Sequence, residues 1–260
     1  MKRFLWTGFS FVLIFLGGSL ILGCASGSSP HQALPCREQF ELGRQKFEKK
    51  KYFQAVEELK LLVFNCPGAS MIDTAQYFLA MSYFKQKDYP TAAGEFRKLL
   101  NSFPTSDFAD DALFMLGLSD YQQSPPSELD QTYTLQALEH FQDFLDIYPG
   151  SALLPEVQKY LQAGLDKLAE KAFKNGRTYF RMKDYNASRI YLSEVLEKYP
   201  QSNWAAQAQF LIAESYRLES QKIQALAEYQ KLLENFPNGK LSDQSRKRIE
   251  ELKENQVKKN

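Results

Sequence analysis

Three cysteines and two histidines are the most reactive side chains in this 260-residue chain: Cys24, Cys36, Cys66, His31 and His140. A thiol can carry a lipid, form a disulfide, bind a metal, or attack a substrate when a base lies beside it. The sequence has no Cys/His cluster at metal-ligand spacing, no glycine-rich phosphate loop and no histidine placed to activate a nucleophile. We therefore expect no catalytic residue, no metal and no cofactor, and we predict a protein that is not an enzyme.

The segment from Asp73 to Pro104 carries the pattern of two antiparallel helices that touch closely. Small residues at Ala80 and Ala92 permit the contact, and Pro104 ends the second helix because proline lacks an N–H and clashes with the preceding turn. This spacing is the tetratricopeptide pattern, a helix–turn–helix of about 34 residues. The residues that match it are Leu79, Ala80, Tyr83, Ala92, Phe96, Leu99 and Pro104.

The same pattern recurs along the chain and ends each time at a proline, namely Pro67, Pro104, Pro149, Pro200 and Pro237. The intervals between these prolines are 37, 45, 51 and 37 residues. Five repeats of 37 residues fit the chain if the third gains 8 residues and the fourth is preceded by 14 more. Recurrence of one helical hairpin predicts an all-α solenoid in which each repeat packs on its neighbours.

The two insertions differ in character. The first contains Pro125-Pro126, which excludes a regular helix, so residues 122–130 are expected to form a loop between the two helices of the third repeat. This loop could contact a partner or be a tolerated surface insertion. The second has apolar residues at helical spacing, and 14 residues are almost four helical turns. We therefore predict one long helix over about residues 153–182, which divides repeats 1–3 from repeats 4–5.

The N-terminus has the features of an export signal. Met1-Lys2-Arg3 is basic and residues 4–22 are apolar. Gly23-Cys24 then resembles a bacterial lipobox, which implies removal of residues 1–23 and a diacylglycerol on the thiol of Cys24. Ala25 in place of aspartate resembles an outer-membrane address. The alternative is an uncleaved membrane helix, because the apolar run is nearly long enough to span a bilayer.

Cys36 and Cys66 flank the first predicted hairpin, one before its first helix and one after its second. Antiparallel helices of similar length bring these two positions to the same end, and an exported protein can keep a disulfide. A bridge closing a loop of about 30 residues would stabilise the terminal repeat by roughly 3–4 kcal/mol. The alternative is two unpaired thiols.

Aromatic residues recur at the fifth and twelfth positions of the repeats, which lie on one face of the first helix. Aromatic, Met and Arg side chains are enriched at interfaces, so this face suits an extended peptide or a partner's loop. The alternative is that the rings pack between successive repeats. The predicted binding residues lie in the N-terminal repeats, and we call this set the ladder. Its members are Phe40, Arg44, Phe47, Tyr77, Met81, Phe84, Phe114 and Tyr121.

Net charge excludes one class of partner. The chain has 32 basic and 31 acidic residues, a formal charge of +1. Nucleic-acid binding proteins usually carry a clustered basic surplus, so no nucleic-acid partner is expected.

The lipobox, the short tether and five repeats with extra length in the third and before the fourth resemble the BamD family, the ComL or YfiO-like outer-membrane assembly lipoproteins. The resemblance covers residues 24–240 and rests on segments such as YFLAMSYFKQKDYPTAAGEFRKLLNSFP. It implies a lipid-anchored periplasmic scaffold of the β-barrel assembly complex. The implied partners are the periplasmic domains of the barrel-forming subunit, other assembly lipoproteins and unfolded outer-membrane proteins, with the lipid as the only membrane contact.

The alternative function is that of another periplasmic repeat lipoprotein, serving pilus assembly or cell division, because a fold does not fix a function.

These features also predict how the chain is divided. The expected parts are a signal peptide over 1–23, a lipidated flexible tether over 24–35, repeats one to three over 36–149, the long helix with repeats four and five over 150–237, and a capping helix and tail over 238–260.

Overall fold

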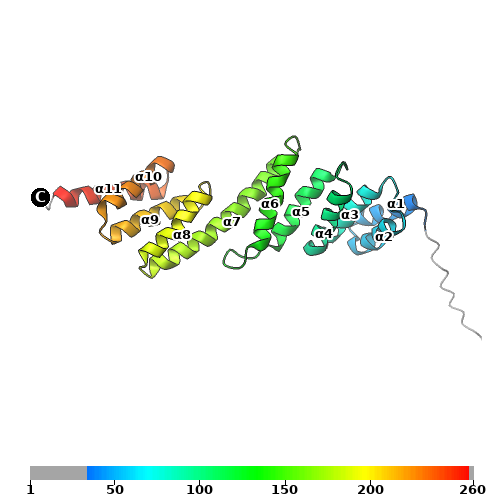
Figure 1. Cartoon of the computed structure of the whole chain (residues 1–260), viewed down its shortest axis with the longest axis horizontal. Helices are drawn as coiled ribbons and strands as arrows, with labels where there is room; N and C mark the ends of the chain where they lie inside the picture. Colours follow the sequence, from blue (N-terminus) through cyan, green and yellow to red (C-terminus); the bar gives the residue numbers. More distant parts are fainter. Residues whose placement is uncertain (1–33, 258–260) are drawn as a thin grey trace, which may run out of the picture. The chain divides into compact units, whose positions relative to one another are not determined.

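The computed structural model describes residues 34–257, which fold into eleven α-helices without a strand (Figure 1). The predicted signal peptide and most of the predicted tether lie outside the described residues. No helix within residues 34–257 is long and apolar enough to cross a membrane. The helices are α1 Cys36–Glu48, α2 Tyr52–Asn65, α3 Ile72–Lys85, α4 Tyr89–Ser102, α5 Ala109–Gln123, α6 Thr132–Ile147, α7 Leu154–Arg181, α8 Tyr185–Lys198, α9 Ala205–Leu218, α10 Lys222–Asn235 and α11 Lys240–Val257.

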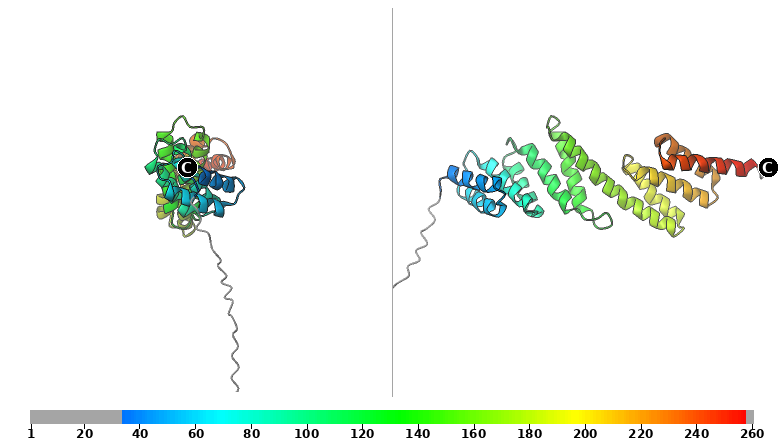
Figure 2. Two further views of the ribbon diagram at one scale, coloured as in Figure 1. Left: turned by 90° about the vertical axis from the view of Figure 1, so that its right-hand side faces the viewer. Right: turned by 180° about the vertical axis from the view of Figure 1, so that it is seen from behind.

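Successive helices pair as antiparallel hairpins, and each hairpin packs on the next along the chain (Figure 2). The close contacts within hairpins depend on small residues. A Cβ atom at Gly43 would lie 2.8 Å from Leu59, and one at Gly117 would lie 2.7 Å from Phe141. Ala55 and Ala92 are completely buried at the matching positions of the second helices. The all-α tetratricopeptide solenoid predicted from the sequence is therefore confirmed.

The long central helix is also confirmed, since α7 runs without a break over 28 residues. Its first half packs on α6 and contacts α5, and its second half pairs with α8 as a repeat hairpin. Thus one helix belongs to two neighbouring parts of the solenoid. After the last repeat, α11 contacts α10 and α9 through Ile249 and Leu252, which cover the buried Tyr229.

The tight turns within hairpins place a non-glycine residue in the left-handed region: Lys50, Lys87, Lys183 and Ser220 have φ between 58° and 65°. A side chain in this region costs roughly 1–2 kcal/mol. Changing Lys183 to glycine should therefore raise the free energy of unfolding by up to about 1 kcal/mol, measured by urea denaturation. The matched control is Lys247→Gly inside α11, which should lower it by about 1 kcal/mol. A destabilised Lys183→Gly variant would contradict the turn geometry.

Candidate partner-binding surface

Cys36 and Cys66 are joined by a disulfide at one end of the first hairpin, with their Cα atoms 6.1 Å apart. Cys36 is the first residue of α1 and Cys66 directly follows α2. Both side chains pack against the apolar cluster of the first hairpin, which includes the buried Leu59 and Leu62. The bridge therefore closes the open end of the first hairpin, opposite its turn.

The ladder does not form one continuous row of rings. Phe40 and Phe114 are only 8% and 7% exposed, so neither ring is open to a partner. At these two positions the rings pack between successive repeats, which was the alternative interpretation of the pattern. Phe47, Tyr77, Met81, Phe84 and Tyr121 are half-buried, and Arg44 is exposed.

One group of ladder residues surrounds Phe78 of α3. Its ring centroid lies 6.4 Å from that of Phe40, 5.1 Å from that of Phe47 and 5.8 Å from that of Tyr77. Tyr77 also stacks on Phe108, at 4.6 Å between centroids. These rings join α1 to α3 and α3 to the start of α5, so they contribute to packing between repeats as well as to the surface.

A second group surrounds Tyr160 of α7. The centroid of this ring lies 6.0 Å from that of Phe114 and 5.4 Å from that of Tyr121. Lys167, two turns further along α7, places its Nζ 5.2 Å from the Tyr121 ring and donates to Ser124. The long helix therefore covers part of the side of α5 that was predicted to bind a partner, but Tyr121 stays half-buried there. Most of the ladder side chains that remain accessible lie on α1 and α3.

Among the half-buried ladder residues, Tyr77 lies near the carboxylates of Asp110 and Asp111. Burial raises the pKa of Tyr77 to about 12, with smaller contributions from Asp111 and Asp110. Burial, together with the neighbouring Asp110, also raises the pKa of Asp111. Arg44 supplies a positive charge on α1, with its Nη2 2.8 Å from Glu41 and its Nη1 3.8 Å from Glu48. The surface thus combines half-buried aromatic rings, a methionine and charges of both signs, which suits a polypeptide better than a small anion or cation.

A loop was predicted over residues 122–130, but α5 continues to Gln123, so the loop spans residues 124–131. Three lysines of α7 hold it against that helix. Lys167 donates to the side chain of Ser124, Lys171 to the carbonyl oxygen of Leu129, and Lys174 to Ser127. Lys174 also pairs with Glu128. The loop therefore connects the third repeat to the long helix. Leu129, which is 57% exposed, is the apolar side chain that it leaves in solvent.

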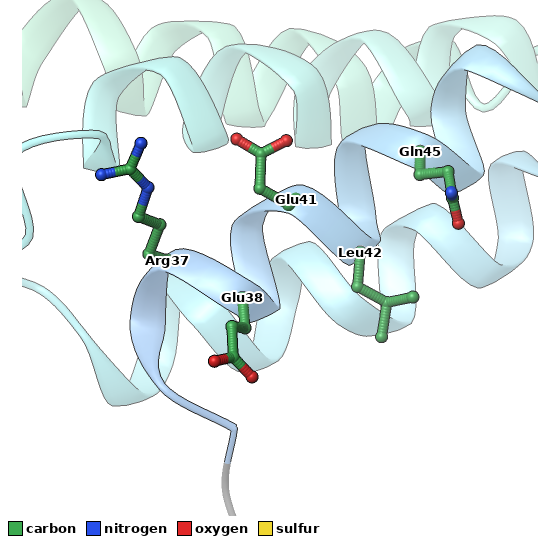
Figure 3. A pocket seen from close by; sticks show the side chains of 5 residues that line it. All are labelled: Arg37, Glu38, Glu41, Leu42 and Gln45. Atoms are coloured by element: carbon green, nitrogen blue, oxygen red, sulfur yellow. The ribbon is translucent and has the colours of Figure 1, made fainter.

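Enclosed sites for small molecules are not apparent in the described part of the chain. A shallow pocket of about 420 Å³ is lined only by α1 residues, and Figure 3 shows Arg37 and Glu41 extending to one side of the helix while Glu38 and Leu42 extend to the other. These polar groups do not converge on a common point. Within residues 34–257, no cluster of three or more His, Cys, Asp or Glu side chains could hold a metal ion.

A comparison with models of protein families shows to which family the chain belongs. A model of the YfiO family, described as outer membrane lipoprotein, matches residues 32–222. The chain belongs to the YfiO family. A tetratricopeptide repeat model also matches residues 207–239 of this YfiO-family protein, which is the fifth repeat predicted from the sequence.

Solved structures similar to this YfiO-family protein are tetratricopeptide proteins. A repeat protein from Bacteroides fragilis has a TM-score of 0.50 with 10% identity, over 85% of this chain and all of that one. The TPR2AB domain of yeast Sti1, solved as a complex with pHSP90, has a TM-score of 0.43 with 15% identity, over 78% of each chain. At these identities the likeness concerns the fold alone. No protein of curated function matches the sequence.

Several residues of the candidate surface were not predicted from the sequence. Phe78 lies one position after the fifth residue of its repeat, and Phe108 and Tyr160 lie outside the positions that define the pattern. The abundance of aromatic residues was a signal for them, but their spacing does not follow the repeat. Only the packing of neighbouring helices brings them to the ladder.

Proposed function

We propose that this YfiO-family protein is a non-enzymatic, lipid-anchored scaffold on the periplasmic face of the outer membrane. It binds the periplasmic domains of the barrel-forming subunit, other assembly lipoproteins and segments of unfolded outer-membrane proteins. The observation that carries this proposal is the family match over residues 32–222 of an outer membrane lipoprotein family. A tetratricopeptide solenoid supports it, because stacked hairpins expose extended surfaces that bind other proteins. The lipid is proposed to be attached to Cys24.

The partners can be identified by a pull-down from detergent-solubilised envelopes with a C-terminally tagged protein. We expect recovery of a large outer-membrane barrel protein with periplasmic domains, together with smaller lipoproteins. Recovery of pilus or division proteins without a barrel partner would reject the assembly role. The same preparation tests the anchor, since mass spectrometry of the N-terminal peptide should show acyl chains on Cys24 and no residues before it.

We propose that the extended segment of an unfolded outer-membrane protein binds to α1 and α3, next to the accessible ladder residues. Arg44 is exposed and Met81 is half-buried, so both can be changed without removing a ring from the aromatic clusters. Replacing both by alanine should weaken binding of an aromatic-ended strand peptide at least about tenfold, because Arg and large apolar anchors carry most binding energy. Fluorescence anisotropy measures the affinity.

The matched control for this pair is Lys98→Ala together with Lys60→Ala, which changes exposed side chains on the second helices of the same two repeats. Helicity should stay intact in both double variants. Unchanged peptide affinity in the Arg44 and Met81 variant would place the client site elsewhere.

A further inference from the structure

The turns of the first two hairpins form the basic edge, which we define as Lys49, Lys50, Lys51, Lys85 and Lys87. All five side chains are exposed. Among the described residues none of them lies in an ion pair. The adjacent acids are already engaged, because Glu48 pairs with Arg44 and Asp88 caps α4. The positive charge of the basic edge is therefore not neutralised within the described fold.

A pocket lies between these turns. It has a volume of about 380 Å³, and Lys50, Lys51 and Lys85 line it together with Phe53 and Gln86. The Nε2 atom of Gln86 is buried and has no hydrogen-bond partner among the described residues. A buried amide donor without an acceptor is unfavourable, and such groups often mark a site that a ligand completes. Three ammonium groups and an amide donor without an acceptor can together bind an anion such as a phosphate.

Exposed apolar side chains adjoin this charge on the outward face of α2. Phe53 is 77% exposed and Phe64 is 84% exposed. They are eleven residues apart, which places them on the same helix face about 16 Å from each other. Leu61, 52% exposed, lies toward the same side. Large aromatic side chains are rarely left in water in this number on one short helix without a partner.

The corresponding turns of the later repeats show that the tetratricopeptide turn does not require these lysines. The fourth repeat has Met182-Lys183-Asp184 at its turn and the fifth has Glu219-Ser220-Gln221. The fifth repeat does keep an exposed apolar residue, Ile223, 82% exposed, at the position equivalent to Phe53. The fourth repeat also has exposed Arg181 and Lys183 beside the exposed Met182, so the first repeat differs in its run of three lysines and in its exposed aromatic rings, Phe53 and Phe64.

We propose that the basic edge and the outward face of α2 bind the surface of a membrane that contains anionic phospholipids. The lysines contact the lipid phosphates, and Phe53 and Phe64 enter the interface between headgroups and acyl chains. Lysines beside exposed phenylalanines are the composition of interfacial membrane-binding helices. Each lysine near an anionic bilayer contributes about 1 kcal/mol of attraction. This contact is additional to the lipid anchor.

The location of the membrane in this proposal rests on the lipid anchor at Cys24 proposed above. The twelve residues 24–35 can reach at most about 40 Å when extended. The 13-residue α1 is only about 20 Å long, so the connection is long enough for both ends of α2 to reach the same bilayer.

The test uses residues 35–260, which form a compact unit and contain neither the anchor nor another subunit. Flotation with vesicles of phosphatidylcholine, with and without phosphatidylglycerol, measures binding. We expect binding to the anionic vesicles only. Reversing the charge of Lys50, Lys51 and Lys85 together to glutamate should weaken it at least about tenfold. Phe53→Ser should weaken it severalfold without a change in helicity, because the ring is exposed.

The matched controls are the reversal of Arg181, Lys183 and Lys247 together to glutamate, which changes the same charge at exposed positions of later elements, and Ile223→Ser at the position equivalent to Phe53. Both should leave vesicle binding unchanged. The proposal is overturned by wild-type protein that does not prefer anionic vesicles, or by controls that lose as much binding as the test variants. Displacement by inorganic phosphate would instead indicate a free-anion site, and equal binding to a polyglutamate peptide would indicate an acidic protein partner; either result also overturns it. Because no partner protein is present, failure here leaves the pull-down result intact.

Discussion

Replacing Glu214 by alanine is expected to lower the free energy of unfolding of the C-terminal repeat by about 2–3 kcal/mol. This buried carboxylate of α9 joins three helices. It accepts hydrogen bonds from Arg217 at 3.1 Å, from Arg248 of α11 at 3.0 Å and from the hydroxyl of Tyr229 in α10. Removing it leaves the Arg217 guanidinium and the buried Tyr229 hydroxyl without this acceptor, while Arg248 keeps its bond to Glu251.

The titration of Glu214 gives this prediction a second readout. Burial alone would raise its pKa, but hydrogen bonds from Arg217 and Tyr229 outweigh burial and hold the pKa below its ordinary value. A group whose pKa is lowered by folding stabilises the protein above its unfolded pKa and loses that contribution as the pH falls through its folded pKa. The difference between wild type and Glu214→Ala should therefore be full at neutral pH and shrink in acid.

Urea denaturation followed by circular dichroism measures this difference across the pH range. Because a solenoid is stabilised locally, the change should be confined to the part of the transition in which the C-terminal repeats unfold. Glu250→Ala is the matched control, since Glu250 is an exposed residue of α11 outside the ion pairs of the described chain. A cost for Glu214→Ala no larger than that for Glu250→Ala would show that the three-helix connection does not exist in solution.

Reduction of the Cys36–Cys66 disulfide is expected to cost about 3–4 kcal/mol, the loop-closure entropy of a bridge with a sequence separation of 30. The loss should be confined to the first repeat, which has a neighbour on one side only. Urea denaturation with and without a reductant measures it, and the variant with both cysteines changed to alanine should match the reduced wild type and ignore the reductant. Peptide mapping by mass spectrometry without reduction should show the linked peptides, and two free thiols would contradict the pairing.

Much of the fold was predictable because the sequence of each repeat marks where its helices touch and where the second helix ends. Pro104 and its equivalents lie two residues after the end of the second helices, and the small residues at Gly43 and Ala80 mark the close contacts. The long helix was predictable because its apolar spacing continues through the inserted residues, and α7 ends within a residue of the expected bounds. These features are local, so one sequence was enough to place them.

The candidate surface was harder to predict because it depends on which face a neighbouring helix covers. The sequence placed Phe114 and Tyr121 on a helix face, but it did not indicate that Tyr160 of α7 packs on that face. Residues with little sequence signal also make specific contacts between helices. Gln76 of α3 donates to the side chain of Glu95 in α4 at 2.7 Å, and the first and fifth repeats repeat this pair.

The assembly role itself is tested most directly by depleting the protein in its native host and measuring the folded β-barrel proteins in the outer membrane. We expect folded barrels to decline while other envelope proteins persist. Wild-type protein should restore them, whereas Cys24→Ala, which lacks the site for the lipid, should not. Normal levels of folded barrels after depletion would contradict the assembly role and leave a tetratricopeptide lipoprotein that serves another envelope process.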